Sequence, residues 1–297
     1  MIDKLEFLLA LAREKHFGRA AEACGVTQPT LSAGVKQLED TFGVLLVNRG
    51  SRFQGFTAEG ERVLEWARRI VGDARAMRDE VHALRHGLAG RLKLAAIPTA
   101  LAMVEALTTP YRARHPNVQF TVYSRTSIQV LTELENLEID AGITYLDNEP
   151  LGRVTAVPLY REHYRLLVAA DGPLGDRDKV TWKEVAQVPL CLLTPEMQNR
   201  RIIEHLLRDT GNNPNIMLES DSMILLYSHV RTGRWASVMP ARLAGTLGLT
   251  DVLRAIPIME PEASYTVGLV APAREPMTPL TAALVTEARR VAKVLTD

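Results

Sequence analysis

The sequence predicts a multidomain α/β protein with a short helical unit, one long helix and a large two-lobed α/β domain. A chain of 297 residues exceeds what one hydrophobic core usually supports, so two or more domains are expected. From Val63 to Leu88, apolar residues recur at alternating spacings of four and three, which predicts a long helix. Beyond residue 91, short apolar runs alternate with helical stretches, as is typical of α/β domains.

The composition argues against a disordered, fibrous or membrane-spanning protein. Hydrophobic residues make up 46% of the chain and charged residues 24%, as in ordinary globular proteins. Lys and Arg (35) balance Asp and Glu (35), so net charge alone does not indicate a nucleic-acid partner. No apolar run approaches the roughly 18 residues of a membrane span, and no secretory signal precedes the first helical pattern. We therefore expect a cytoplasmic protein without a membrane partner.

Cysteine and histidine usage argues against metal and disulfide chemistry. Cys24 and Cys191 are too few and too far apart for a disulfide framework or a CxxC site. Each lies in an apolar pattern and is expected to be an inert apolar residue, with a redox role as the alternative. The seven histidines are scattered without metal-ligand spacing, so no metal and no cofactor are expected.

The first 57 residues predict three helices and a small β-wing. Two short amphipathic helices are interrupted at Gly25. Thr27 can cap a third helix, whose first turn accepts Pro29 because a missing N–H costs nothing there. From Gly43 to Thr57 the pattern is strand, turn, strand, with a basic tip that contains glycine.

The third predicted helix has two unlike faces. The buried stripe consists of Leu31, Val35, Leu38 and Phe42, and the opposite face of Pro29, Ser32, Ala33 and Lys36. A helix that enters the major groove of DNA needs such a small, polar face, because bulky side chains would hold it away from the base edges. Gln28 adds an amide suited to adenine, and Thr30 a hydroxyl suited to a base or a phosphate. A solvated helix surface is the alternative.

The long helix, from Ala58 to about Leu88, carries a narrow apolar seam. The seam consists of Val63, Ala67, Ile70, Ala74, Met77, Val81, Leu84 and Leu88. Charged residues surround it, so the helix fits the coiled-coil pattern and is expected to pair with a second chain. The alternative is packing on its own domain. Gly87 and Gly90 mark a hinge.

The remaining residues predict strands alternating with helices. The strand candidates are 92–97, 118–123, 141–145, 164–169, 190–193, 236–239 and 266–270, and the helix candidates are 103–114, 128–137, 201–208 and 280–295. This alternation predicts mainly parallel sheets. About 205 residues is long for one such sheet, so two lobes with a cleft between them are expected.

The N-terminal segment resembles the helix-turn-helix of LysR-type transcriptional regulators. The matching residues are Phe17-Gly18-Arg19-Ala20-Ala21-Glu22, Val26-Thr27-Gln28-Pro29-Thr30-Leu31-Ser32, Leu38-Glu39, Phe42-Gly43-Val44-Leu45-Leu46, Arg49 and Phe56-Thr57-Ala58-Glu59-Gly60. Cys24, Gly25 and Val47 depart from the family's usual residues at packing positions. The rest of the chain fits the family's linker helix, hinge and two-lobed effector domain, which is similar to periplasmic solute-binding proteins.

The resemblance implies three parts and a set of DNA contacts. These parts are a winged helix-turn-helix domain (1–57), a linker helix and hinge (58–91) and an effector-binding domain (92–297). Lobe I would hold about 92–162 and 267–297, and lobe II about 163–266. The candidate DNA-binding residues are Arg19, Thr27, Gln28, Pro29, Thr30, Ser32, Lys36, Arg49, Arg52 and Thr57. Arg49 and Arg52 would contact the minor groove or phosphates, with a solvated loop charge as the alternative.

The effector site is expected where strands end and helices begin. Ligands of doubly wound sheets bind beyond the carboxyl ends of strands, near the unpaired N–H groups of helix N-termini. The candidate effector-binding residues are Thr99, Ala100, Thr126, Ser127, Thr144, Tyr145, Thr194, Met197, Ser222 and Met239. These loops match the family's pocket segments; ordinary helix caps are the alternative. A small anionic metabolite would suit them, and Arg125, Arg200 and Arg201 are candidates for a bidentate contact to a carboxylate.

Together these features predict a regulator rather than an enzyme. The chain lacks GxxxxGK[ST], GxSxG, HExxH and a GxGxxG after a strand. The resemblance implies a homo-oligomer on inverted-repeat promoter DNA, with two dimers forming a tetramer and RNA polymerase as a candidate partner. The alternatives are an effector-independent DNA-binding protein and an α/β binding or catalytic module whose N-terminal helices only dimerise.

Overall fold

The computed structural model describes residues 1–48, 50, 53–247 and 252–295. The chain forms two compact units. The first unit holds Met1–Leu88 with two short segments, Glu135–Glu138 and Arg274–Pro279, and the second holds the remainder. Among the described helices, none combines the length and the apolar character that a membrane crossing requires.

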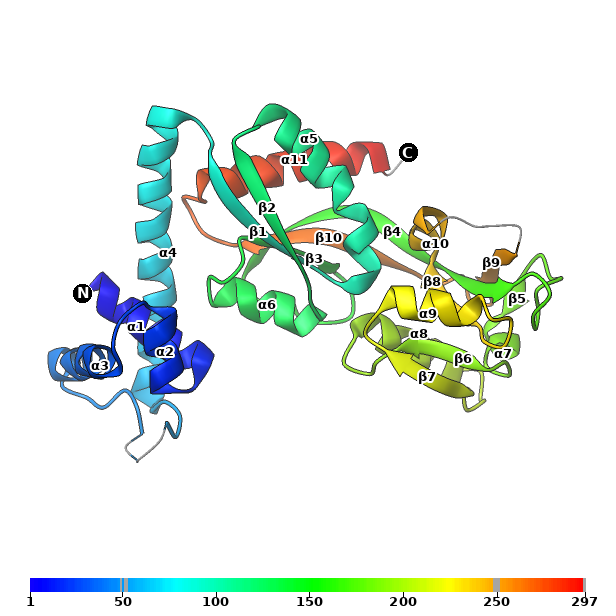
Figure 1. Ribbon diagram of the computed structural model, residues 1–297, viewed down its shortest axis with the longest axis horizontal. Helices are drawn as coiled ribbons and strands as arrows, with labels where there is room; N and C mark the ends of the chain where they lie inside the picture. The colour runs from blue at the N-terminus through cyan, green and yellow to red at the C-terminus, as the bar shows by residue number, and fades with distance from the viewer. Residues whose placement is uncertain (49, 51–52, 248–251, 296–297) are drawn as a thin grey trace. The chain divides into compact units, whose positions relative to one another are not determined.

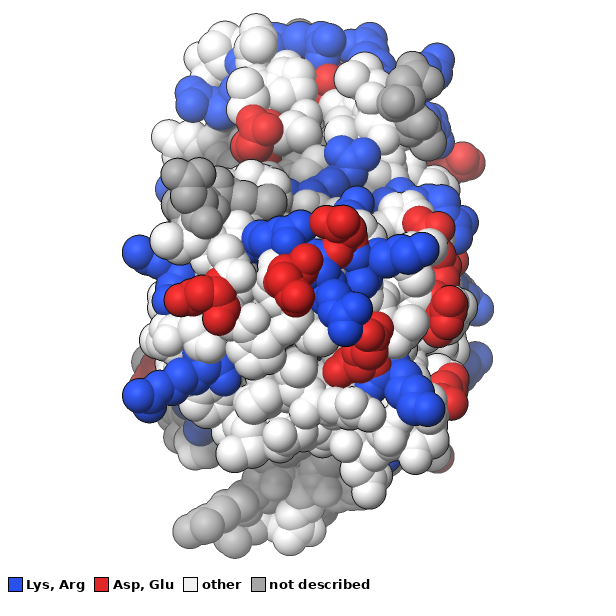
Figure 2. All heavy atoms as spheres, turned by 90° about the vertical axis from the view of Figure 1, so that its right-hand side faces the viewer, with Lys and Arg blue, Asp and Glu red and all other residues white. Residues whose placement is uncertain are grey.

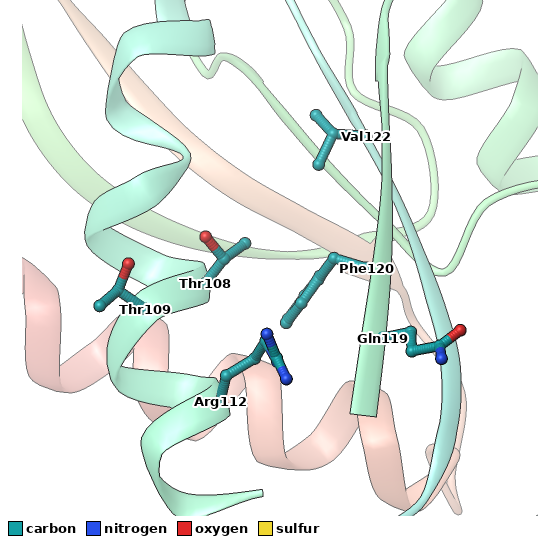
Figure 3. Close-up of a pocket in the computed structure, with 6 residues that line it drawn as sticks. All are labelled: Thr108, Thr109, Arg112, Gln119, Phe120 and Val122. Carbon is teal, nitrogen blue, oxygen red and sulfur yellow. The ribbon is translucent and has the colours of Figure 1, made fainter. Parts of the chain in front are cut away.

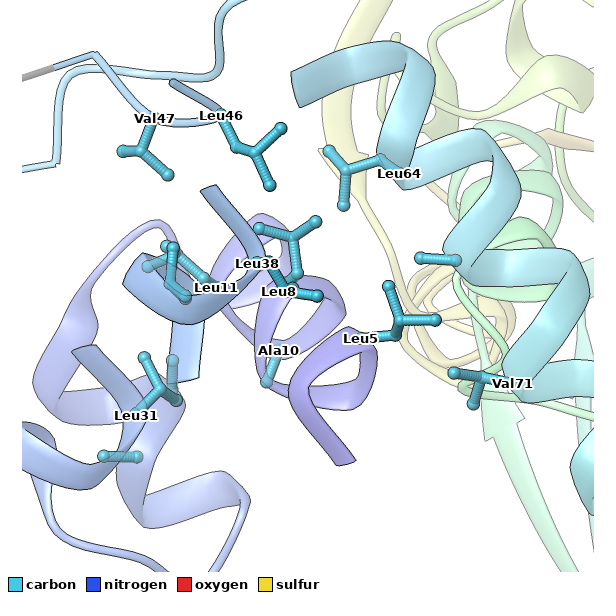
Figure 4. Packing of buried hydrophobic residues seen from close by; sticks show 14 residues of the cluster. Leu5, Leu8, Ala10, Leu11, Leu31, Leu38, Leu46, Val47, Leu64 and Val71 are labelled. Atoms are coloured by element: carbon cyan, nitrogen blue, oxygen red, sulfur yellow. The ribbon is translucent and has the colours of Figure 1, made fainter. Parts of the chain in front are cut away.

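Three helices precede the long helix, as the sequence predicts. They are α1 (Ile2–Glu14), α2 (Phe17–Ala23) and α3 (Gln28–Phe42), followed by α4 (Ala58–His86). Leu8, Leu11, Leu31 and Leu38 form the centre of one core, to which α4 adds Leu64 (Figure 4). Removal of this apolar surface from water is the main force that holds the four helices together.

Local chemistry fixes the turn between α2 and α3. Gly25 adopts a φ of 67°, which side chains rarely allow. The Thr27 side chain caps α3 by accepting a hydrogen bond from the backbone N–H of Thr30. Gly34 lets α3 cross α1 closely, because a Cβ there would lie 2.6 Å from a ring carbon of Phe7.

The wing is shorter than predicted. Between α3 and α4, the described residues pair only through an isolated antiparallel bridge between Val47 and Phe56. Backbone hydrogen bonds from Asn48 to Gly55 and from Thr57 to Leu46 flank this bridge. The predicted antiparallel pairing across the wing is therefore confirmed, but the two full strands are not.

The predicted seam of α4 divides into two parts. Ala67, with its neighbours Leu64 and Val71, is buried in the core that α1 shares, so the intrachain alternative holds for the first half. The large apolar side chains that remain exposed on α4 are Trp66, Ile70, Met77, Val81 and Leu84. We call these five residues the apolar stripe of α4. The helix ends at His86 rather than Leu88, because Gly87 follows with a φ of 70°.

The second unit is built on a large mixed sheet with strand order β2-β1-β3-β10-β4-β9-β5, to which β8 adds through β4. Its strands are β1 (Gly90–Ala96), β2 (Val118–Ser124), β3 (Ala141–Tyr145), β4 (Val154–Ala169), β5 (Val180–Thr181), β8 (Ser237–Pro240), β9 (Leu253–Met259) and β10 (Ser264–Pro272). β1 is parallel to β2 and β3, but β10 pairs antiparallel with β3 and β4, and β4 with β8 and β9. The prediction of mainly parallel sheets is wrong here, because β4 and β10 carry the chain through the sheet in opposite directions.

Helices cover both faces of the sheet around β1 and β3. η1 (Pro98–Met103), α5 (Glu105–Arg114), α6 (Ser127–Glu135) and α11 (Pro279–Leu295) belong to this part, which we call lobe I. α5 and α11 lie over one face and α6 over the other (Figure 1). The hydroxyl of Tyr111 on α5 donates to the carbonyl oxygen of Leu280 on α11 at 3.1 Å, which joins the two helices.

The other part of this unit, lobe II, carries a small parallel sheet of its own. This sheet pairs β6 (Leu190–Leu193) with β7 (Ile216–Ser220). The helices of lobe II are α7 (Trp182–Val185), α8 (Gln198–Arg208), α9 (Met223–Val230) and α10 (Ala241–Thr246). The long strands β4 and β10 run between the lobes, and the predicted lobe boundaries near residues 163 and 266 fall inside them.

One face of lobe II has mixed charge. On the side that carries β5 and β9, Lys and Arg side chains lie among Asp and Glu (Figure 2). Such mixing produces no extended field of one sign of the kind that attracts a phosphate backbone.

Candidate DNA-binding surface and effector site

The N-terminal half of α3 presents an accessible polar surface. Gln28, Pro29, Thr30 and Lys36 are exposed and Ser32 is half-buried, while Leu31, Val35 and Leu38 are buried as predicted. Within the described part of the chain, the side chains of Gln28 and Lys36 make no hydrogen bond or ion pair. Both are therefore available to a partner.

Phe42 corrects one prediction for this helix. The sequence places it in the buried stripe, but its side chain is 45% exposed. It is the last residue of α3 and lies outside the core cluster, because Gly43 ends the helix in the left-handed conformation.

Other predicted DNA-binding residues already have partners in the chain. The Thr27 hydroxyl lies 2.9 Å from that of Thr30. The Thr57 hydroxyl donates to Leu45 O at 2.6 Å and accepts from Gly60 N at 2.9 Å, so it caps α4. An Arg19 Nη donates to Glu14 O at 2.7 Å. These side chains fix the helices that carry the accessible residues. Arg49 and Arg52 lie outside the described residues.

The predicted effector residues of lobe I are largely buried. Thr99, Ala100, Ser127, Thr144 and Tyr145 are each at most 2% exposed. Thr126 accepts from Gln129 N at 3.2 Å, so it caps α6 as the alternative interpretation expects. The hydroxyl oxygens of Thr99 and Thr144 are buried without a hydrogen-bond partner among the residues that the structure describes. Because an unsatisfied buried hydroxyl is costly, it suits a ligand or a bound water.

In lobe II the predicted residues divide between caps and core. The hydroxyl of Ser222 caps α9 by accepting from Leu225 N at 3.4 Å. Met197 and Met239 belong to the apolar core of this lobe, together with Cys191. Thr194 also has a buried hydroxyl that lacks a partner among the described residues. Among the predicted residues of lobe II that the structure describes, Thr194 therefore resembles the hydroxyl sites of lobe I.

A buried polar network that the sequence did not reveal joins the lobes. The Tyr145 hydroxyl, at the end of β3, donates to the carboxyl oxygen Oε1 of Glu162 on β4 and lies 3.3 Å from the hydroxyl of Tyr164. Asn199 on α8 donates to Tyr145 at 3.1 Å, and its neighbour Gln198 donates to Asp147 O at 3.0 Å. In the sequence, this network is indicated only by the polar pair Gln198 and Asn199, which lies where the amphipathic helix α8 begins.

Glu162 is the unusual group in this network. It is 2% exposed, and burial raises the pKa of its carboxyl to about 8, although the hydrogen bond from Tyr145 partly opposes this. Its Oε2 has no hydrogen-bond partner among the described residues. A neutral carboxyl is the form that such a site favours near pH 7.

The three candidate arginines are in different environments. Arg125 pairs with Glu133. Arg200 is 4% exposed and is held by Leu193 O, Glu204 and Glu219, which makes it a structural group of lobe II. Arg201 pairs with Glu149, and both side chains are partly exposed. Arg125 and Arg201 therefore keep similar access to water, with 33% and 36% of their side chains exposed, whereas Arg200 does not.

The cysteines are poor nucleophiles. Burial raises the pKa of the Cys191 thiol to about 11, and its Sγ lies 3.5 Å from Ala236 O. Burial likewise raises the pKa of the Cys24 thiol. No group of three or more His, Cys, Asp or Glu side chains suited to a metal ion occurs in the described ranges.

A surface hollow of about 720 Å³ lies between α5 and β2 on lobe I. Its lining residues are Thr108, Thr109, Arg112, Gln119, Phe120 and Val122. Thr108 and Arg112 reach from the helix toward the ring of Phe120 on the strand (Figure 3). None of the predicted effector residues lines this hollow, which is therefore separate from them.

Two protein-family models match the chain. The model of the bacterial regulatory helix-turn-helix protein, lysR family, matches residues 2–61. The model of the LysR substrate binding domain matches residues 85–293. These ranges cover the three-helix unit and the two-lobed domain in turn.

Curated relatives and solved structures agree with this match. The DNA-binding transcriptional dual regulator OxyR of Escherichia coli (strain K12) is 28% identical over 270 residues, which span 91% of this chain and 88% of that protein. The hydrogen peroxide-inducible genes activator of Dickeya chrysanthemi is 27% identical over 279 residues, with the same coverage. A full-length OxyR variant from Pseudomonas aeruginosa matches with a TM-score of 0.76 at 26% identity, covering 99% of this chain and 95% of that one. The chain therefore belongs to the LysR family of transcriptional regulators, with a DNA-binding helix-turn-helix and a C-terminal domain whose effector modulates regulation.

Proposed function

We propose that this regulator binds inverted-repeat promoter DNA as an oligomer and that a small anionic metabolite in its C-terminal domain modulates this binding. The observation that carries the proposal is the accessible first turn of α3, where Gln28 has an uncommitted amide. A side-chain amide forms two hydrogen bonds with adenine in the major groove. Thr30, Ser32 and Lys36 would add contacts to bases and phosphates, and Arg49 and Arg52 contacts to the backbone.

The apolar stripe of α4 supports the oligomer. Met77, Val81 and Leu84 are 61%, 51% and 82% exposed, and large apolar side chains in a row are unfavourable in water. A second copy of α4 would cover them and place two α3 helices on two half-sites related by twofold symmetry. Two such dimers would form a tetramer, and RNA polymerase is a further candidate partner. Because its DNA lies in the cytoplasm, the protein would act there.

The effector would bind by hydrogen bonds rather than by thiol chemistry. The unsatisfied hydroxyls of Thr99, Thr144 and Thr194 are ready to bond to a polar ligand. Relatives are named for hydrogen peroxide, but the thiol of Cys191 is buried and its pKa is raised to about 11. A thiolate sensor requires the opposite conditions, an exposed thiol with a low pKa. We therefore propose an effector that binds reversibly. Because the sequence lacks the enzyme motifs named above, we also propose that the protein is not an enzyme.

DNA binding measured against salt tests the proposal. Labelled DNA from upstream of the protein's own gene should bind more tightly than a scrambled duplex of equal length, with an affinity that falls as salt rises. Equal affinity for both duplexes would contradict sequence recognition. An identical result with and without every metabolite fraction would favour the alternative, an effector-independent DNA-binding protein.

A further inference from the structure

We propose that the carboxylate of Glu149 is an internal competitor of the effector: it occupies a carboxylate-binding site formed by Ser127 and Arg201, and the effector has to displace it. This inference rests on the proposed effector-modulated function and specifies the chemistry of the ligand. The ligand would carry a carboxylate that replaces the side chain of Glu149 between the same two groups.

Glu149 receives hydrogen bonds from both lobes. It lies in the segment between β3 and β4. Ser127, the first residue of α6 in lobe I, donates from its hydroxyl to Oε2 at 3.2 Å. Arg201, on α8 in lobe II, donates from Nε to Oε1 at 3.1 Å and also from Nη2. One carboxylate therefore links α6 to α8.

Burial restricts one of the groups that hold this carboxylate, and further hydrogen bonds fix the other. Ser127 is 2% exposed, so its hydroxyl has little access to water. The Nη1 atom of Arg201 donates to Pro195 O at 3.3 Å and to Glu196 O at 2.7 Å. These bonds hold the guanidinium so that Nε and Nη2 face the carboxylate. A fixed guanidinium edge and a buried hydroxyl form a site that is organised before a ligand arrives.

The pair is also able to exchange. The side chains of Glu149 and Arg201 are 28% and 36% exposed, so water reaches the ion pair and weakens it. Arg200 does not offer this opportunity, because it is buried among its partners. Arg125 is 33% exposed, but its partner Glu133 belongs to the same lobe. Of the three arginines, Arg201 has the carboxylate partner that side chains of both lobes bind.

Displacement would couple ligand binding to the relation between the lobes. While Glu149 bridges Ser127 and Arg201, the segment between β3 and β4 is held against both helices. An external carboxylate would keep Ser127 and Arg201 bridged but release this segment. The effector can bind only to molecules in which Glu149 has left the site. The apparent association constant is therefore the intrinsic one multiplied by the fraction of such molecules.

The test uses the full-length protein and acetate, the smallest carboxylate probe, at constant ionic strength. Glu149→Ala removes the competitor. Glu133→Ala is the matched control, because it also takes the carboxylate partner from a partly exposed arginine, but among the described residues no hydroxyl completes a carboxylate site there. We expect Glu149→Ala to bind acetate about tenfold more tightly than the wild type, and Glu133→Ala to bind it as the wild type does. Titration calorimetry or the acetate dependence of the unfolding temperature measures the affinity.

A double variant locates the site. Glu149→Ala with Arg201→Met should lose the tightened acetate binding. The proposal is overturned if Glu149→Ala binds acetate no better than the wild type, or if the double variant binds it as well as the single variant does. Failure of the proposed function gives a different result from failure of this proposal. In that case acetate would still bind more tightly to Glu149→Ala, but no metabolite fraction would change DNA binding by the wild type.

Discussion

The side-chain amide of Asn199 donates a hydrogen bond to the hydroxyl of Tyr145 at 3.1 Å, and this bond ties α8 of lobe II to β3 of lobe I. Both residues are buried. Tyr145 in turn donates to Glu162 on β4, so three separate elements meet at one hydroxyl. The bond therefore links the two lobes directly.

Asn199→Ala should weaken this connection. The loss of one buried hydrogen bond is expected to lower the free energy of unfolding by about 1 kcal/mol. Asn212→Ala is the control, because in the described part of the chain the amide of Asn212 donates within its own turn, to the carbonyl and hydroxyl oxygens of Thr210. Urea unfolding of the full chain measures both variants. An unchanged midpoint for Asn199→Ala would show that the bond does not stabilise the domain.

Glu162 should make stability depend on pH. Its pKa is about 8 in the folded protein and 4.5 in its ordinary state, so between these values the folded protein holds a proton that the unfolded chain has lost. The free energy of unfolding should therefore fall as pH rises through this window, by up to about 1.4 kcal/mol per pH unit. The stabilisation that comes from keeping Glu162 protonated is complete below pH 4.5 and is lost above about pH 8. Glu162→Gln should flatten this slope; parallel pH profiles of variant and wild type would exclude Glu162 as its source.

Gln28→Ala should reduce sequence discrimination. If the amide of Gln28 reads a base, the variant should lose about 1–3 kcal/mol of preference for the intact half-site over a mutated one. Gln37→Ala is a matched control, because Gln37 is exposed on the same helix nine positions along, on the opposite side. Competition binding with both duplexes measures the preference. A preference that survives in Gln28→Ala would remove this residue from the base contacts.

Val81→Asp should separate the subunits. Val81 is 51% exposed in the apolar stripe of α4, and a carboxylate from each copy would meet in the paired helices. Light scattering should then give about half the mass of the smallest wild-type oligomer. Val81→Ile, which keeps the stripe apolar, should leave the mass unchanged. An oligomer that persists in Val81→Asp would place the interface elsewhere.

Cys191 should be inert in the native protein. With a pKa raised to about 11, only about one thiol in 10,000 is ionised at pH 7. Iodoacetamide should therefore label Cys191 only after denaturation, and mass spectrometry of the labelled peptides can follow this. Rapid labelling of the folded protein would reopen the redox alternative.

Helices and their limits could be predicted from the sequence where the signals are local. Thr27, Gly25 and Gly43 act through their own backbone or that of near neighbours, and α3 begins and ends where they require. The start of β4 was not predicted, since the strand begins at Val154 rather than near residue 164. Pro158 and the charged Glu162 interrupt the apolar pattern, although Glu162 is buried in the folded domain.

The contacts between the lobes depend on tertiary structure. Nothing local to Glu149, Ser127 or Arg201 indicates that they meet, because 22 and 52 residues separate Glu149 from its two partners. The same holds for Phe42, whose apolar side chain fits the buried stripe by spacing but lies beyond the core. Periodicity identifies which face of a helix is apolar, but not how far along the helix the contact extends.

A footprint of the purified protein on the DNA upstream of its own gene tests most directly whether the protein recognises a promoter sequence. At fixed salt, with and without pooled cellular metabolites, we expect a protected inverted repeat whose boundary changes with one metabolite fraction. No protection at moderate salt would contradict sequence-specific DNA binding by this protein.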